Sequence, residues 1–471
     1  MIIVDDLNTQ VGCFDGPAVT PNIDALAAKG VQFNNAYSAC PSCNPSRTSM
    51  FTGQRPERNG VFSNSQHFRE TEPAKYLTTL PQLLMANGYN TISAGKIFHN
   101  RRGTKPEPSP LSDPISWTFQ ASIDAELFFG NDFKKEFLDE NGAPLWVKRT
   151  TGKIFEGDEK ALKSTWSYGP IDVPPTRTLD FNTAEFGAAF LTGDMSHPEV
   201  AKAPNPNEKP FFLACGIFRP HIPILAPREF FELYENDENA HRLELPELPD
   251  DDIDDLPKAS GAGRHWYVRY LKDYPEEQRR LRHAYLAATS YADAAVGVIL
   301  DGLKNSTFAD NTVVILIGDH GYQLGEKDRL GKAAVWRGSS RTPMVIRIPN
   351  GEIGKSGEPV SLIDIYPTIL DLLNLKSVHH LDGESLVPLL EDPEAGRNIP
   401  AVISNTGGTA IGIVQDNWHY INYTDGSEEL YDHGVDATEW KNLLHPDNYS
   451  EKYAAIAKRL RKYIPENRGK R

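Results

Sequence analysis

Four short apolar runs constrain the fold of this chain more than any other feature of its sequence. Each run is followed at once by polar or glycine residues: IIV by Asp5, YNTISA by Gly95, FFLACGIF by Arg219 and TVVILIG by Asp319. Buried strands that alternate with helices are typical of an α/β fold, in which helices sandwich a large, mainly parallel sheet. Ligands bind beyond the carboxyl ends of such strands, so we expect the residues after the four runs to converge.

Helices are predicted between the runs. TPNIDALAAKG begins with Thr20 as a cap and Pro21 in the first turn, and it ends at Gly30. TLPQLLMANGY follows the same pattern from Thr79. Residues 281–303 form a longer, alanine-rich helical pattern that leads into the fourth run. Pro near the start and Gly just past the end are the expected order of helix signals.

The pattern changes after about residue 375. Short strands are predicted in IGIVQDNWHYINYT and ELYDH, followed by a last helix from about Glu451. We therefore predict a large α/β domain over 1–374 and a smaller C-terminal α+β domain over 375–471.

Two stretches look inserted. Residues 101–180 are rich in Pro, Gly, Trp and Asp, and residues 236–262 contain the acidic run DDDIDD. Charge runs are usually solvated, so the acidic run is interpreted as a solvated loop. Trp117, Trp146 and Trp166 could stack on a sugar, although core packing is the commoner role of a tryptophan.

The net charge of −15 over 471 residues excludes some classes of partner. A surface of this sign repels nucleic acids and anionic lipids, so neither is expected as a partner. No run approaches the roughly 18 apolar residues of a membrane span, and no span is predicted. The sequence shows no signal-peptide pattern and opens with MIIVDD, which resembles the second half of a strand. We expect the leader and the first strand residues to lie outside this sequence.

The cysteines do not form a recognisable framework. There are four, Cys13, Cys40, Cys43 and Cys215, which is too few and too scattered for a disulfide scaffold. A zinc site built on Cys40-Pro-Ser-Cys43 would need a second ligand pair, and dithiol chemistry would need a thioredoxin-like unit. Cys40 is expected to be a small buried residue.

The residues after Cys43 carry more information. Pro45 suits a first helical turn, which places Cys43 at the positive end of a helix. The pattern Cys43-x-Pro-Ser-Arg47, four residues, then Thr-Gly resembles the signature of the formylglycine-dependent (type I) sulfatases of the alkaline-phosphatase superfamily. The resemblance implies that a maturation enzyme oxidises Cys43 to an aldehyde, 3-oxoalanine. A hydrated aldehyde has two hydroxyls, one to attack sulfur and one to expel sulfate, and a thiol cannot do this.

Candidate metal ligands follow two of the predicted strands. Asp5 and Asp6 come after the first run, and Asp319 and His320 after the fourth. An Asp-Asp pair alone is as often a strand-end cap or turn. With Cys43, these residues match the single divalent-metal site of the family, and their oxygen-rich set favours Ca²⁺, with Mg²⁺ as second choice.

The remaining polar residues complete the set that the resemblance implies. His99 in GKIFH would take the proton from the hydrated aldehyde when sulfate leaves, and His221 in RPHIP would protonate the departing sugar oxygen. Lys96, Lys332 and Arg47 would balance charge on the sulfate and the nucleophile. Each histidine taken alone is more often a structural hydrogen-bonding residue.

The resemblance extends over nearly the whole chain. PNIDALA, GKIFH and FFLACGIFRPHIP look similar to iduronate-2-sulfatases and related bacterial polysaccharide sulfatases. It implies hydrolysis of sulfate esters on a uronate-containing or marine polysaccharide or oligosaccharide, in the periplasm or outside the cell. Two alternatives stay open: a phosphatase or phosphonate ester hydrolase of the same superfamily, and a catalytically silent protein that binds sulfated glycans.

Overall fold

The computed structural model describes residues 1–99, 112–123, 168–262 and 271–468. Most of the predicted insertion at 101–180 lies outside these residues, and so do Trp146 and Trp166. Trp117 is within them and is buried, with its ring stacked on Phe212 at 6.1 Å between centroids. Of the three tryptophans considered for sugar stacking, Trp117 therefore packs in the core.

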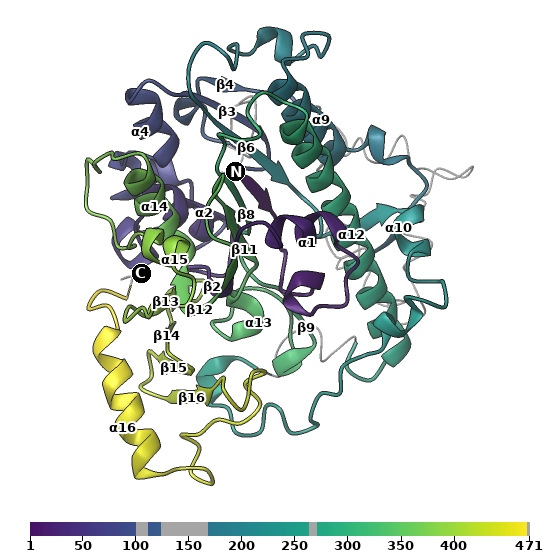
Figure 1. Ribbon diagram of the computed structural model, residues 1–471. Coiled ribbons are helices and arrows are strands. Elements are labelled where there is room, and N and C mark those ends of the chain that lie inside the picture. Colours follow the sequence, from purple (N-terminus) through teal and green to yellow (C-terminus); the bar gives the residue numbers. More distant parts are fainter. Residues whose placement is uncertain (100–111, 124–167, 263–270, 469–471) are drawn as a thin grey trace.

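The main sheet confirms the α/β prediction. In the described residues it has eight strands in the order β12-β2-β11-β8-β1-β6-β3-β4 (Figure 1). Seven of them run parallel, and β11 is antiparallel to both its neighbours. The strands are β1 (Ile2–Val4), β2 (Val31–Tyr37), β3 (Asn90–Gly95), β4 (Phe119–Gln120), β6 (Phe211–Ile217), β8 (Val314–Gly318), β11 (Met344–Arg347) and β12 (Gly354–Ser361).

All four apolar runs are strands, and they are neighbours in the sheet. They form β8, β1, β6 and β3, in that order across its centre. Successive side chains of a strand point to opposite faces, so Ile3 packs in one core while Ile2 and Val4 pack in the other. The nearly continuous apolar character of β1, β6 and β8 follows from this burial on both faces.

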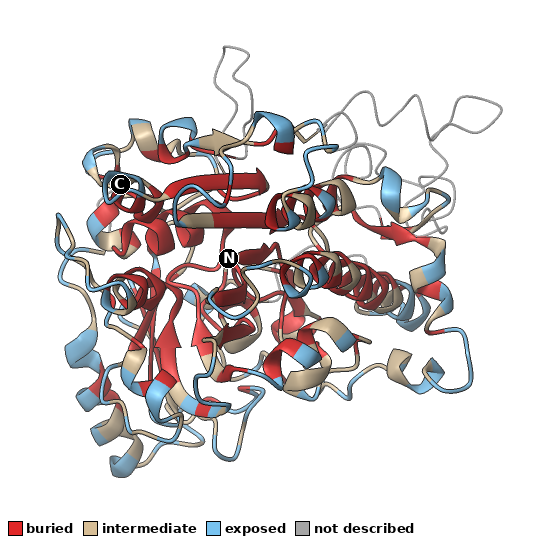
Figure 2. Ribbon diagram, turned by 45° about the horizontal axis from the view of Figure 1, so that its top comes forward, coloured by how far each residue is buried: buried red, intermediate tan, exposed pale blue. Residues whose placement is uncertain are grey.

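Helices cover both faces, as Figures 1 and 2 show. One core holds side chains from α2 (Cys43–Thr52), α4 (Leu80–Ala86), α14 (Ile365–Leu372) and α15 (Val387–Glu391). The other holds side chains from α1 (Pro21–Ala27), α9 (Leu179–Thr192) and α12 (Pro275–Lys304). The predicted helices correspond to α1, α4 and α12.

Among the helices of the described ranges, only α12 is long and apolar enough to cross a membrane. However, 78% of its apolar window is buried inside the protein. This burial agrees with the absence of a predicted span, because the apolar character serves packing against α9 and the sheet.

A second, antiparallel sheet lies toward the C-terminus. Its strands are β13 (Ala401–Ser404), β14 (Ala410–Gln415), β15 (Trp418–Tyr423) and β16 (Glu428–Asp432), and α16 (Glu451–Leu460) packs on it. These elements agree with the predicted strands and last helix. The boundary at residue 375 stays a prediction, and α15, which follows it in the chain, packs in the core of the main sheet.

The other elements are short. They are α3 (Pro56–Asn59), α10 (Arg228–Glu232), α13 (Arg337–Ser340), the paired strands β5 (Tyr168–Ile171) and β7 (Ile224–Pro227), and the paired strands β9 (Gln323–Leu324) and β10 (Leu330–Gly331). Short 3₁₀ helices occur at Gly12–Phe14, Phe68–Glu70, Ala74–Tyr76, Pro114–Ser116, Pro175–Arg177, Val200–Lys202, Ala240–Leu243, Lys258–Ser260, Glu326–Asp328, Leu362–Asp364 and Arg461–Tyr463.

Strand β1 begins later than the strands beside it. Its register pairs Ile2 with Cys215, whereas β6 starts four residues earlier at Phe211. A cavity of about 570 Å³ lies there and is lined by apolar side chains from both helix layers and by Met1. The Met1 ammonium donates to the Leu213 carbonyl at 2.8 Å, and burial lowers its pKa from 8.0 to about 6.

We predict that, in a protein expressed from Met1, three apolar β-branched residues added before Met1 stabilise the fold. The unfolded amine binds more protons than the folded one between its two pKa values, so a chain expressed from Met1 loses stability as pH falls from 8 to 6. The loss totals about 3 kcal/mol. The extension moves the charge away and fills the cavity, so its benefit in denaturant unfolding is larger at about pH 6 than at about pH 9. A Gly-Ser-Gly extension is the control, and it should restore only the pH-dependent part of the free energy of unfolding. If the apolar extension raises the free energy of unfolding equally at both pH values, the interpretation is contradicted.

Candidate functional site

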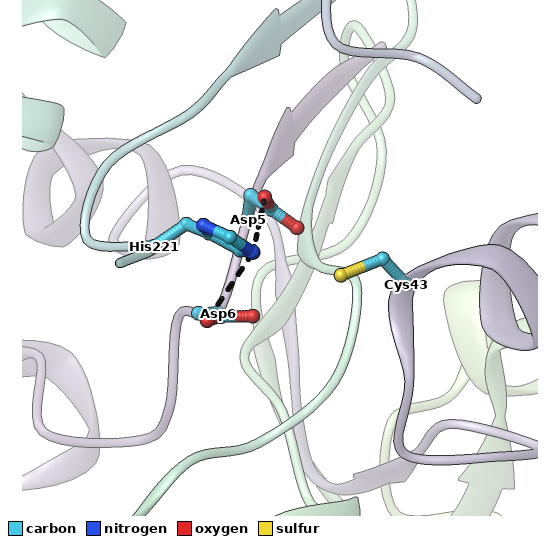
Figure 3. Close-up of side chains that lie close together, drawn as sticks. All are labelled: Asp5, Asp6, Cys43 and His221. Carbon is cyan, nitrogen blue, oxygen red and sulfur yellow. Dashed lines mark ion pairs between the residues drawn. The ribbon is translucent and has the colours of Figure 1, made fainter. Parts of the chain in front are cut away.

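Polar residues from the ends of four neighbouring strands meet at the carboxyl edge of the main sheet, as predicted. Asp5 and Asp6 follow β1, Asp319 and His320 follow β8, Lys96 follows β3, and His221 lies four residues after β6. Figure 3 shows the Asp5 and Asp6 side chains and the His221 ring on one side of this site, facing Cys43 at the start of α2.

Cys43 is the first residue of α2, so its thiol lies at the positive end of the helix. The helix ends at Thr52, and the φ of 66° at the next residue, Gly53, accounts for the glycine of the Thr-Gly pair. The Lys332 ammonium donates to Cys43 Sγ at 2.9 Å, and His320 Nε2 lies 3.5 Å from it. Cys40 is also buried, and both thiols are free.

The surroundings of Cys43 favour an anion. Burial raises the pKa of its thiol, but Lys332, Lys96 and hydrogen bonds with His221 and His320 lower that pKa well below its ordinary value. Charge stabilisation therefore outweighs the cost of burial at this position.

Buried cations pair with the carboxylates. Lys96 donates to Asp5, and Lys332 donates to Asp6 at 2.5 Å. Although burial raises the pKa of Asp5, Lys96, His221 and Arg47 hold it well below its usual range. Burial and the charge of Asp5 instead raise the pKa of Asp319 to about 6.

Arg47 joins α2 to the sheet. Its Nε donates to Asp319 at 2.8 Å and its Nη2 to Asp5 at 3.3 Å. Its Nη1 donates to the carbonyl oxygens of Lys96 and Ile97, at 2.5 and 3.0 Å. The guanidinium is fully buried, and its planar set of donors suits this many acceptors.

The three histidines of the site differ in exposure. His221 Nε2 lies 3.9 Å from Asp5 and 4.0 Å from Asp6, and its side chain is 13% exposed (Figure 3). His99 is half-buried, and burial lowers its pKa although the contact with Cys43 acts in the opposite direction. His320 is fully buried; burial lowers its pKa, but Asp319 prevails and raises it to about 9.

The carboxylate oxygens of the site fit a hard divalent cation. Ligand atoms of Asp5, Cys43, Asp319 and His320 lie within 4.8 Å of one another, and those of Asp5, Asp6, Cys43 and His221 do the same. Asp6 Oδ2 is buried and lacks a hydrogen-bond partner among the described residues. An unpaired buried carboxylate oxygen is costly, and a cation would satisfy it.

A third group of possible ligands, His419, His433 and Glu439, has a different explanation. Both imidazoles hydrogen-bond to Glu439 Oε1, at 2.5 and 2.8 Å, and Glu439 Oε2 accepts from the Arg337 N–H at 2.7 Å. Hydrogen bonding thus ties the turn after β16 to β15 and to α13.

Sequence reasoning missed two residues that support the site. The Phe218 ring lies 4.5 Å from the His221 ring and 4.9 Å from the Lys96 ammonium. Asp180, near the start of α9, accepts from the N–H groups of Phe218 and Arg219, at 2.7 and 3.0 Å. The position of Phe218 at a strand end was a usable signal, whereas Asp180 acts from a distant helix.

We predict that Arg47→Ala destabilises the protein by about 3–5 kcal/mol, because it leaves buried carboxylates without their partner. The free energy of unfolding in denaturant measures the loss. Arg58→Ala is the control, since Arg58 is 52% exposed and pairs with Asp382. Arg58 is solvated and Asp382 keeps its ion pair with Arg55, so this variant should lose about 1 kcal/mol or less. Equal losses for the two variants would contradict the role of Arg47.

Comparison with known proteins places this arrangement in a family. The family described as Sulfatase matches residues 1–375, and the one described as N-sulphoglucosamine sulphohydrolase, C-terminal, matches residues 325–467. A sulfatase of Formosa agariphila is 31% identical over 97% of this chain and 84% of its own length. The iduronate 2-sulfatase of Mus musculus is 31% identical over 74% of this chain and 59% of its own length.

Solved structures share the fold at lower identity. A protein in complex with its substrate D-glucosamine-2-N,6-O-disulfate has a TM-score of 0.71 and 20% identity, covering 100% of this chain and 99% of that one. A phosphonate monoester hydrolase from Silicibacter pomeroyi has a TM-score of 0.73 and 20% identity, covering 99% and 94%. The fold alone does not separate these activities. The family match over residues 1–375 and the relatives that span the chain distinguish them. This chain belongs to the sulfatase family and is a sulfuric ester hydrolase.

Proposed function

We propose that this sulfatase hydrolyses sulfate esters on a uronate-containing or marine-type polysaccharide or its oligosaccharides, with Cys43 acting after oxidation to formylglycine. One observation carries the proposal: Cys43 Sγ, at the first turn of α2, lies 2.9 Å from the Lys332 ammonium and faces Asp5 and Asp6. The resemblance to iduronate 2-sulfatase supports the carbohydrate class.

Cys43 is the residue that a maturation enzyme would modify. When present, the hydrated aldehyde supplies one hydroxyl that attacks sulfur and a second whose deprotonation releases sulfate. The chain contributes the surroundings: Lys332 and Lys96 favour negative charge at this position, and α2 directs its N-terminal N–H groups toward it.

Asp5, Asp6, Asp319 and His320 would hold the metal, Ca²⁺ in preference to Mg²⁺. When bound, the cation supplies positive charge beside the sulfate oxygens and the nucleophile. Asp6 Oδ2, which has no hydrogen-bond partner among the described residues, supports this assignment.

The histidines provide the proton transfers in this proposal. Burial keeps the pKa of His99 low, so it is neutral and can accept a proton at the Cys43 side of the site. His221 lies between the carboxylates and solvent, where the sugar oxygen leaves, and would protonate that oxygen. Arg47 holds Asp5 and Asp319 in place and offsets their charge.

We also propose that the protein works in the periplasm or outside the cell. Polymeric sulfated substrates are anionic and do not cross membranes unaided, so an enzyme that acts on them must meet them there. The acidic surface of the chain requires that the sulfate be attracted by the local cations of the site.

We predict that Cys43→Ala lowers kcat on an aryl sulfate by about 10⁴-fold or more, because the attacking group is lost. Cys40→Ala, at a buried thiol three residues away, is the matched control and retains activity. Mass spectrometry of the Cys43 peptide, from a host with the maturation enzyme, should show the aldehyde. An intact thiol with full activity, or faster turnover of an aryl phosphonate than of the sulfate, contradicts the proposal. Glycan binding by the aldehyde form without sulfate release favours a binding protein instead.

We predict that Asp6→Asn lowers the amount of metal bound to the protein. Elemental analysis after equilibration with Ca²⁺ measures this, and it does not depend on turnover. Asp15→Asn is a close control, because Asp6 and Asp15 have φ of 60° and 61°, but Asp15 is exposed. Asn tolerates this backbone region as Asp does. Unchanged metal content in Asp6→Asn would remove this residue from the ligand set.

A further inference from the structure

The acidic run is not uniformly solvated. Asp251 and Asp254 are exposed, as the sequence predicts, but Asp252 is 5% exposed. Burial raises the pKa of the Asp252 carboxyl, and the Lys327 ammonium acts in the opposite direction. The prediction of a solvated loop is therefore wrong for this residue, because a partner distant in sequence compensates its charge.

The partner belongs to a hairpin that joins two parts of the site. β9 and β10 pair through only two residues each, between His320 on one side and Lys332 on the other. Lys327 and Asp328, at the tip, have φ of 56° and 52°, in the left-handed region, which is unfavourable for a lysine. So short a ladder is not stable by itself, and its tip must be held by contacts from elsewhere.

Asp252 provides three of those contacts, and the Lys272 ammonium provides another by donating to Asp328 at 2.7 Å. Its Oδ2 accepts from the Lys327 N–H at 2.7 Å, and its Oδ1 accepts from the Lys327 ammonium at 2.7 Å. The same ammonium donates to the Asp252 carbonyl at 3.2 Å. The Lys327 residue is 1% exposed, so solvent does not replace these bonds readily. One carboxylate thus fixes both the backbone and the side chain of the tip.

The base of the hairpin is fixed to the site itself. Lys332 directly follows β10 and donates to Asp6 and Cys43. The next residue, Ala333, has φ of 80° and donates its N–H to the Pro41 carbonyl at 2.8 Å. The segment 327–333 is therefore held at both ends, by Asp252 at Lys327 and by the Pro41 carbonyl at Ala333. Lys332 lies next to the second of these ends.

We infer that Asp252 is a positioning residue for Lys332: by anchoring Lys327 it holds the β9–β10 hairpin in the conformation that places the Lys332 ammonium on Cys43. The expected effect of Asp252 on turnover rests on the proposed function. Its expected effect on the hairpin does not. Among the described residues, Asp252 forms no hydrogen bond or ion pair with Cys43, Asp5 or Asp6; its partner is Lys327.

The first test is amide hydrogen exchange in Asp252→Asn, with Asp251→Asn as the matched control. The neutral amide cannot compensate the Lys327 charge, so exchange over 325–333 should be at least about tenfold faster than in the control. Exchange elsewhere in the main sheet should be unchanged. Equal exchange over 325–333 in the two variants overturns the inference, whether or not the protein has sulfatase activity.

The second test uses turnover of an aryl sulfate. Asp252→Asn should lower kcat by about 10- to 100-fold with little change in KM, since a misplaced group costs this much. Asp252→Glu should recover part of the loss. In a Lys332→Ala background, Asp252→Asn should cost less than about twofold more, because both changes act through one ammonium. If the kcat losses of Asp252→Asn and Lys332→Ala multiply in the double variant, the two residues act independently and the inference is overturned. If the parent protein has no sulfatase activity, only the proposed function is contradicted.

Discussion

The Arg47 guanidinium is the interaction on which the site depends. Three carboxylates and a thiol with a lowered pKa cannot share a buried space without compensation, and Arg47 contacts two of those carboxylates and two carbonyl oxygens at once. It also binds α2 to the ends of β1 and β8, since it pairs with Asp5 and Asp319. The helix that carries Cys43 is therefore held against the sheet by the charges that the chemistry requires.

The centre of the fold could be predicted from sequence because it is buried on both faces. Residues of β1, β6 and β8 are apolar nearly throughout. β3 is equally buried although it contains Asn90, Thr91 and Ser93. The four strands are adjacent, so their carboxyl ends had to meet. That reasoning brought Asp5, Asp6, Asp319, His320, Lys96 and His221 to one edge, and the motif after Cys43 supplied α2. The roles of these residues stay proposals, but their proximity is a property of the structure.

The rest of the sheet was not predictable by the same pattern. β2 has the sequence VQFNNAY and the edge strand β12 has GKSGEPVS, and their polar residues and glycines hide the strand signal. β11 has only four residues and runs antiparallel, which no local feature indicates. Asp252 and Asp180 were missed for a different reason: their burial is compensated by Lys327 and by backbone N–H groups that are far away in sequence.

The C-terminal sheet shares a core with the segment that follows Lys332. Trp336 packs with Tyr37 and β13–β16 side chains, and its indole donates to Glu429, which also accepts from Tyr423 and Tyr431. The two regions are consequently not modular. A recombinant catalytic fragment without the second sheet would expose Trp336 and leave its indole without an acceptor. Exchange of C-terminal regions between relatives would succeed only if the 333–337 segment were exchanged together with the sheet.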